Sequence, residues 1–275
     1  MVSRRTAIGS DERSGVLHAA NLSRFAAEWI DPDERVRGAV ATYWAVSWDL
    51  PPGEEISQRI IDFPAVTLSI EAGAVPAPFI VSTVRPGAWN RFIRGRGDVF
   101  AIRLRPAGLA VVSDLCAPDL GTETEVTPQL DPRLYNLLRE IGSAGTSIER
   151  AQRADIVLGA LLDERPLTDR HRLANEAMDL LLRAPTSKAG EAVATELNCN
   201  VRTIQRVLRE CIGLGPTDVA RRIRLQEVAR RLATDEAAAT RIAAELGYVD
   251  QAHMIREFKT VTGDTPGQYA KSARS

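Results

Sequence analysis

The chain of 275 residues contains few metal-ligating or disulfide-forming side chains, with three cysteines and three histidines. The cysteines are odd in number and widely spaced, which argues against a disulfide framework and against a zinc site. The histidines lie too far apart in the sequence to form a metal pair, so no metal and no other cofactor is expected. The residues concerned are Cys116, Cys199, Cys211, His18, His171 and His253.

Long apolar runs are also missing. No run approaches the 18 or more residues that a membrane-spanning helix needs. The N-terminus carries positive charges with no apolar segment behind them, so a signal peptide is not expected. A content of 44% hydrophobic and 26% charged residues is typical of a globular protein with a real core. We therefore expect a cytoplasmic protein without a membrane partner.

The chain as a whole has no excess of charge, at a formal net charge of −1, but its two parts differ. Residues 171–275 carry 16 basic and 13 acidic residues, whereas residues 1–170 carry 19 basic and 23 acidic ones. An acidic front and a mildly basic back indicate that only the second part meets phosphate groups.

The usual catalytic signatures are absent: G-x-S-x-G, a P-loop, H-E-x-x-H, and G-x-G-x-x-G at a strand-to-helix turn. We therefore expect a protein that is not an enzyme. The alternative left open is a DNA-repair enzyme with Cys116 as its nucleophile. Such a cysteine needs a base nearby, and the sequence around it offers none.

Five segments of the first half alternate apolar and polar residues as short strands do. Turn-forming residues separate them, and Gly95-Arg96-Gly97 is expected to be a hairpin turn. Strands of this length and spacing predict a small antiparallel sandwich or barrel. The segments are residues 39–50, 64–72, 79–84, 89–95 and 99–106.

Two helices are expected to close this β-rich part. Asp131 before Pro132 would cap the first, and Ser147 would cap the second. A charged linker with one proline follows at residues 163–169. The predicted fold is α+β, with an N-terminal extension, a β-rich sandwich-like or barrel-like sensor or dimerisation domain with closing helices, and an all-α domain. The boundaries are 1–35, 36–165 and 170–275.

Three tryptophans of the β-rich part have two interpretations. Trp44, Trp48 and Trp89 pack in the core, which is the commoner role, or they line a ligand pocket. Four polar side chains near that core are candidates for such a pocket, with no site assigned to any of them. They are Asp62, Arg91, Arg103 and Arg105.

Residues 193–213 follow the plan of a helix-turn-helix. Asn198 suits the left-handed backbone of a tight turn, and Asn200 suits the N-cap of a second helix. At about 100° per residue, that second helix has an apolar stripe and, directly opposite, a polar one. The polar stripe consists of Arg202, Gln205, Arg206 and Arg209.

These polar side chains are the types that contact DNA. Arginine binds guanine edges and glutamine binds adenine edges in the major groove, and further arginines bind phosphate. We predict base contacts from Arg202, Gln205 and Arg206, and phosphate contacts from Arg209 and Asn200. The alternative for the polar stripe alone is an ordinary solvated helix face.

The same plan recurs at residues 241–269, with Gly247 in the turn and Asp250 as the N-cap. The packing stripe is expected to contain Met254, Phe258 and Val261. His253 has the alternatives of a metal ligand or a pH switch, but no partner for it is seen nearby. The residues predicted to face DNA are Ala252, His253 and Arg256 for bases and Lys259 for phosphate.

A single long helix that begins at Pro216 is predicted between the two units, over residues 216–233. Two groove-reading helices joined in this way can enter successive major grooves on one face of DNA, about 34 Å apart.

Residues 171–270 resemble the DNA-binding domain of AraC/XylS-family transcription regulators. The resemblance implies sequence-specific operator binding and control of transcription. It is carried by Ile242-Ala243, Gly247-Tyr248, Asp250-Gln251-Ala252-His253, Arg256, Phe258-Lys259, Gly263, Thr265-Pro266 and Tyr269, and in the first unit by Arg202-Thr203-Ile204-Gln205-Arg206, Gly213 and Pro216.

Residues 36–128 resemble a domain of unknown function that often precedes this type of DNA-binding domain. The resemblance implies a β-rich sensor or dimerisation module and names no ligand. Its motifs are Tyr43-Trp44, Trp48-Asp49-Leu50, Phe63-Pro64, Gly95-Arg96-Gly97 with Phe100, and Arg103-Leu104-Arg105-Pro106.

The predicted partner is double-stranded operator or promoter DNA. RNA polymerase, a small-molecule effector and a second copy of the chain are left open as further partners. Cys199 and Cys211 flank the first groove-reading helix, where small apolar fillers are commoner than a redox switch.

Overall fold

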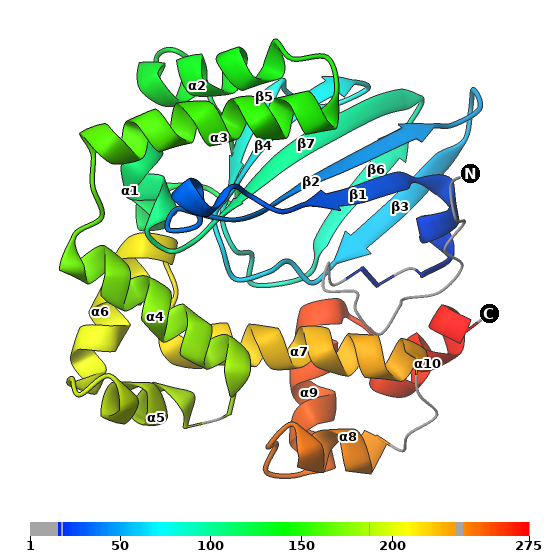
Figure 1. Cartoon of the computed structure of the whole chain (residues 1–275). Coiled ribbons are helices and arrows are strands. Elements are labelled where there is room, and N and C mark those ends of the chain that lie inside the picture. Colours follow the sequence, from blue (N-terminus) through cyan, green and yellow to red (C-terminus); the bar gives the residue numbers. More distant parts are fainter. Residues whose placement is uncertain (1–15, 18, 187, 235–238, 275) are drawn as a thin grey trace.

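A six-stranded antiparallel sheet forms the centre of the front half in this computed structural model, which describes residues 16–17, 19–186, 188–234 and 239–274 (Figure 1). Its strands follow the spatial order β1-β2-β7-β4-β5-β8, and β3 pairs with β6 as a separate ribbon. The strands are β1 Ala26–Ile30, β2 Val40–Asp49, β3 Glu55–Ile60, β4 Thr67–Gly73, β5 Phe79–Ser82, β6 Trp89–Arg94, β7 Arg96–Leu104 and β8 Glu123–Glu125.

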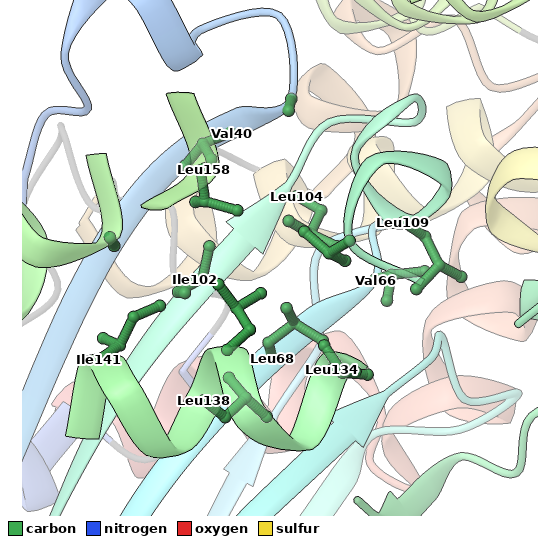
Figure 2. Packing of buried hydrophobic residues seen from close by; sticks show 14 of the residues in the cluster. Val40, Val66, Leu68, Ile102, Leu104, Leu109, Leu134, Leu138, Ile141 and Leu158 are labelled. Carbon is green, nitrogen blue, oxygen red and sulfur yellow. The ribbon is translucent and has the colours of Figure 1, made fainter. Parts of the chain in front are cut away.

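The large sheet carries buried residues on both of its faces. One face carries Tyr43, Phe100 and Ile102 and packs against helices α2 and α3. Figure 2 shows the aliphatic part of this cluster, to which strands and helices both contribute. The other face carries Trp48 and Ala101 and packs against isoleucines of the β3–β6 ribbon. The three helices of the front half are α1 Gly108–Val112, α2 Pro132–Gly142 and α3 Ser147–Glu164.

The predicted N-terminal extension is not separate from the β-rich part. Strand β1 lies within residues 1–35 and pairs with β2, with Trp29 opposite Trp44. The alternation rule missed it because four of its five residues are exposed, so it has no apolar side to detect. Strands β3 and β8 were not predicted either.

The prediction of a hairpin turn at residues 95–97 is wrong. Strand β6 ends at Arg94 and β7 begins at Arg96, yet β6 pairs with β3 while β7 pairs with β2 and β4. Gly95 adopts a φ of 55°, which glycine tolerates, and turns the chain from one sheet into the other.

Two boundaries of the closing helices differ from the prediction. Asp131 caps α2 as expected, but Thr146 rather than Ser147 caps α3, because its hydroxyl accepts from the Glu149 N–H in a capping box. The linker is shorter than the predicted 163–169, since only residues 165–168 separate α3 from the next helix.

Seven helices make up the back half, within the described residues, and together with the β-rich front they confirm the predicted fold class. Helix α7 begins at Pro216, as predicted. No helix in the described part of the chain is both long and apolar enough to cross a membrane. The helices are α4 Asp169–Arg183, α5 Ala189–Glu196, α6 Val201–Ile212, α7 Pro216–Thr234, α8 Ala239–Glu245, α9 Gln251–Thr262 and α10 Pro266–Arg274.

Candidate nucleic-acid interface

Helices α5 and α6 form the first helix-turn-helix unit. Asn198 takes the left-handed conformation predicted for it, with a φ of 49°. The turn is closed by the Cys199 N–H, which donates to the Ala194 carbonyl at 2.9 Å. Asn200 is the N-cap of α6, and its Oδ1 accepts from the Arg202 N–H at 2.8 Å. The local sequence therefore fixes where α6 starts and which side it buries.

Helices α8 and α9 form the second unit with a turn of one more residue. Gly247 takes the left-handed position, and the Tyr248 N–H donates to the Ala243 carbonyl at 3.0 Å. Asp250 caps α9 by accepting from the His253 N–H. The extra residue is Val249, whose side chain is 82% exposed. The first helices of the units are therefore offset by 49 residues and the second helices by 50.

The outward face of α6 carries uncompensated positive charge. Arg202, Arg206 and Arg209 are exposed, Gln205 is half-buried, and the opposite stripe is buried. In the described part of the chain, none of these three guanidiniums takes part in an ion pair or a side-chain hydrogen bond. The one acidic residue of α6, Glu210, pairs with an arginine of α4. These donors are therefore free to contact an external acceptor.

The outward face of α9 is less basic. Ala252, Arg256 and Lys259 are exposed, whereas Met254 and Phe258 are buried as predicted. The two cations have no ion-pair partner among the described residues, as on α6. This face thus offers two charged donors where α6 offers three together with an amide.

His253 does not share the open position of its neighbours. Its Nε2 lies 3.3 Å from Glu257 Oε1, and its ring contacts the Tyr248 ring edge-to-face. The expectation that it has no partner nearby is therefore wrong. The carboxylate lies four residues further along the same helix, where the two side chains share a face. His253 borders the outward face and keeps about a third of its side chain exposed.

The sequence reasoning missed a charged cluster between α7 and α9. The Oε1 atom of Glu257 lies 3.4 Å from Arg221 Nε, and its Oε2 atom lies 3.9 Å from Arg224 Nη2. The Arg224 guanidinium also lies over the Tyr248 ring, 4.9 Å from its centroid. The sequence did contain a signal for this cluster, because Glu257 occupies the position that the buried Val207 has in the first unit.

Polar contacts join the first unit to the front half. Arg105 forms an ion pair with Asp179 of α4 at 2.7 Å. Asn175, buried on the same helix, accepts from the Ala107 N–H at 3.1 Å and donates to the Gly38 carbonyl at 2.8 Å. Arg105, one of the polar candidates for a ligand pocket, lies at this junction and lines a cavity of about 460 Å³ there together with Asp179.

The second unit is joined to the front half through α7. Arg222 is buried and donates to the carbonyls of Asp62 and Gly87, at 3.0 and 2.9 Å, and it pairs with the Asp62 carboxylate. Burial lowers the pKa of Arg222 to about 10, so the guanidinium stays charged at neutral pH. Gln226 donates to the Ile61 carbonyl at 2.7 Å.

A hydrophobic cluster reinforces this second attachment. Leu17 and Ile61 of the front half are buried together with Phe258, Tyr248 and other apolar residues of the second unit. The core of the first unit contains residues of the back half alone, within the part of the chain that the structure describes. The two units are therefore attached by different kinds of contact.

Of the three tryptophans considered as pocket residues, Trp44 and Trp48 pack in one hydrophobic cluster and Trp89 does not. Trp48 is buried and borders a groove of about 790 Å³ at one end of the sheet, together with Arg24 and Arg96. Trp89 lies elsewhere, with its Nε1 donating to Glu123 at 2.8 Å. The remaining polar candidates have partners of their own. Arg91 pairs with Glu71, and Arg103 lies over the rings of Trp29 and Phe63.

Two of the cysteines border one cavity of about 300 Å³ between the front half and α6. Cys116, Cys211 and His171 all line it. Burial raises the pKa of the Cys211 thiol to about 11. Burial and then the charge of Arg170 lower the pKa of His171. Among the described residues, no group of three such side chains is arranged to hold a metal ion.

Two helix-turn-helix units, with basic outward faces on their second helices, define the class of helix-turn-helix DNA-binding proteins. Comparison with known families agrees. Residues 193–272 match the family described as a helix-turn-helix domain, and residues 28–124 match a domain of unknown function, DUF6597. Both matches fall on the segments whose residues resemble an AraC-type DNA-binding domain and the domain that often precedes it, which confirms the resemblance seen in the sequence.

Individual proteins are more distant. The chain is 28% identical over 155 residues to an uncharacterized HTH-type transcriptional regulator of Haemophilus influenzae, covering 56% of this chain and 47% of that protein. The chain therefore spans about half the length of this curated relative. Solved structures with some likeness include the C-terminal domain of AraT from Geobacillus stearothermophilus, at 23% identity and a TM-score of 0.36 over 38% of this chain and 88% of that one. Another is ToxT from Vibrio cholerae, at 11% identity and a TM-score of 0.39 over 90% of this chain and 97% of that one.

Proposed function

We propose that the chain is a transcription regulator that binds operator DNA through α6 and α9 in two successive major grooves. The observation that carries this proposal is the outward face of α6. Three exposed guanidiniums there lack any partner in the described residues, directly opposite a buried stripe. Paired surface arginines are common elsewhere in the chain, so this unpaired group stands out as a site for an external anion.

We assign base contacts to the middle of each outward face. In the first unit, Arg202 and Arg206 suit guanine edges, and Gln205 suits adenine. In the second, Arg256 is the strongest candidate, since Ala252 offers only apolar contact with a thymine methyl group. His253, held beside Glu257, is assigned to the edge of the groove.

Phosphate contacts are assigned to Arg209, Lys259 and Asn200. The two cations are exposed one turn beyond the base-reading arginines. Asn200 uses its Oδ1 to cap α6, so its side-chain N–H group is the donor left for a phosphate. Contacts of this kind position the protein without reading sequence.

The length of α7 supports a two-groove arrangement. Its 19 residues span about 28 Å at a rise of about 1.5 Å per residue. Successive major grooves on one face of B-DNA lie about 34 Å apart, which is comparable once the reading helices extend from either end. Figure 1 shows α6 near the start of α7, and α9 contacts α7 near its middle, at Arg221 and Arg224.

For the front half we keep two roles, a small-molecule sensor and a dimerisation module. Either role fits its contacts with both units, because a change in the front half would reach α4 and α7 directly. The groove beside Trp48 is the place for a sensed molecule, and the exposed edge strand β1 is the place for a second copy. Action in the cytoplasm and contact with RNA polymerase belong to the same proposal.

The test is selection of bound sequences from a random duplex pool with the full chain, followed by salt titration on the selected sequence. We expect one motif with two blocks about one helical turn apart. Lys259→Ala should weaken binding equally for all sequences and reduce the salt slope by about one. A pool without an enriched motif, with weak and purely salt-driven binding, would contradict specific reading.

A further inference from the structure

Arg224 lies where the two helix-turn-helix units meet. It belongs to the connecting helix α7, and only 4% of its side chain is exposed. Its Nη1 atom donates to the Pro185 carbonyl at 3.1 Å. Pro185 lies between α4 and α5, the first helix of the first unit. The same guanidinium covers the Tyr248 ring in the turn before α9 and faces Glu257 on α9. One buried cation therefore contacts both units.

The contacts of α7 divide between two sides of the helix. Arg222 and Gln226, four residues apart, reach the front half. Arg221 and Arg224, three residues apart, reach α9. At about 100° per residue these pairs lie on different faces. Arg224 thus lies on a different face of α7 from the two residues that reach the front half.

The charge at this junction is specific to the second unit. The first unit has the apolar Val207 where the second has Glu257. A buried ion pair is often no more stabilising than apolar residues of similar volume, because both charges must leave water. What the guanidinium adds is direction, since its donors are fixed in one plane and one of them donates to the Pro185 carbonyl. The polar junction therefore points to geometry rather than to stability.

We propose that Arg224 is a positioning residue that sets the angle between α6 and α9, and with it the spacing of DNA blocks that the chain accepts. The inference rests on the proposed two-groove function and adds the group that fixes the spacing. Two linked readers gain affinity only when both engage at once, and that gain is lost when geometry forbids it. Each added base pair shifts the second block by about 3.4 Å and turns it by about 35°.

The experiment measures affinity of the full chain for synthetic duplexes with the two selected blocks. The spacing is the selected one or is longer by one or two base pairs, and further duplexes carry a single block. The wild-type chain should lose about tenfold or more in affinity on two added base pairs. Arg224→Met should lose less than about threefold between the same duplexes, because the direct contact between Pro185 and the second unit is lost and the angle between the two reading helices is held less firmly.

A matched control and a second variant separate positioning from folding. Arg230→Met changes the same residue type on the same helix, where Arg230 pairs with Glu227 of α7 and with no other carboxylate among the described residues. It should keep the wild-type spacing preference. The double variant Arg224→Met, Glu257→Val removes both charges. Its second substitution gives the second unit the residue type that the first unit has at Val207. It should lose spacing preference while its melting temperature stays close to that of the wild type.

Two results would overturn the inference while leaving the proposed function in place. The first is an Arg224→Met chain, or the double variant, that keeps the wild-type preference for one spacing. The second is an Arg224→Met chain that loses affinity equally for every duplex, including the duplex with the first block alone. Wild-type binding that ignores spacing would overturn the inference together with the two-groove function.

Discussion

The two helix-turn-helix units share a backbone plan and differ in what their faces carry. The first presents three unpaired guanidiniums and an amide outward, has an apolar interior, and meets the front half through hydrogen bonds and an ion pair. The second presents one arginine and one lysine, has Glu257 on its inner side, and shares a hydrophobic cluster with the front half.

This difference separates two tasks that a tandem reader needs. The first unit has more groups able to distinguish base edges, so it should contribute most of the sequence preference. The second has fewer such groups but is anchored to α7 and to the front half. A change in the front half should therefore move the second unit through its shared cluster and the first unit through the polar contacts of α4.

The largest expected difference concerns stability. Leu208 and Phe258 are equivalent and fully buried, one in each unit. Truncation to alanine should cost about 2–5 kcal/mol for Leu208 and about 3–5 kcal/mol for Phe258. All four tryptophans lie in the front half, so tryptophan fluorescence reports that half. In urea unfolding, Phe258→Ala should lower the fluorescence midpoint, because its cluster includes Leu17 and Ile61.

Leu208→Ala provides the matched measurement for this comparison. Its main effect should appear in the far-ultraviolet circular dichroism of the helices, with a smaller shift in tryptophan fluorescence. Equal fluorescence shifts for the two variants would show that both units are attached to the front half equally strongly.

A smaller effect is expected at the reading faces. Arg206→Ala should cost about 1–3 kcal/mol of operator binding and relax the preference at one position of the first block. The matched Arg256→Ala should relax one position of the second block only. Competition binding against duplexes with single base changes measures both. Unchanged operator binding by Arg206→Ala would exclude the first unit as a reader of DNA.

The smallest effect concerns the cysteines. Cys116 is exposed, whereas burial raises the pKa of the Cys211 thiol to about 11. The thiolate is the reactive form, so Cys211 should be alkylated by iodoacetamide more slowly than Cys116 at pH 7.5, and its rate should rise as the pH approaches 11. Peptide mass spectrometry against time follows both sites. Faster labelling of Cys211 than of Cys116 would favour the alternative in which Cys199 and Cys211 act as a redox switch.

The features that follow from local chemistry could be predicted from the sequence. Asn198, Asn200 and Asp250 set the turns and caps of the reading units, and each has the predicted role. Residue types with one strong local preference carry this information, together with the apolar period of α6 and α9. The alternation of residues 39–50, 64–72 and 99–106 likewise predicted strands, which the structure contains as β2, β4 and β7.

Features that depend on distant partners could not be predicted. The role of Gly95 depends on whether β6 pairs with β7 or with β3, and neither strand alone carries that information. Asp62 and Arg222 are 160 residues apart in the sequence. The residues predicted to contact DNA are outward-facing with the exception of His253, but their roles stay predictions, because roles on DNA depend on a partner outside the chain.

The cluster that joins Leu17 and Ile61 to the second unit has a consequence for how such proteins evolve. A front domain that shares its core with the reader cannot be exchanged for another by recombination at residues 165–170 alone. The new front domain would have to bring apolar residues of matching shape, or the reader would expose the surface that these two residues cover. Inheritance of the two halves is therefore expected to be linked, with compensating changes at Ile61 and in α7 accumulating together.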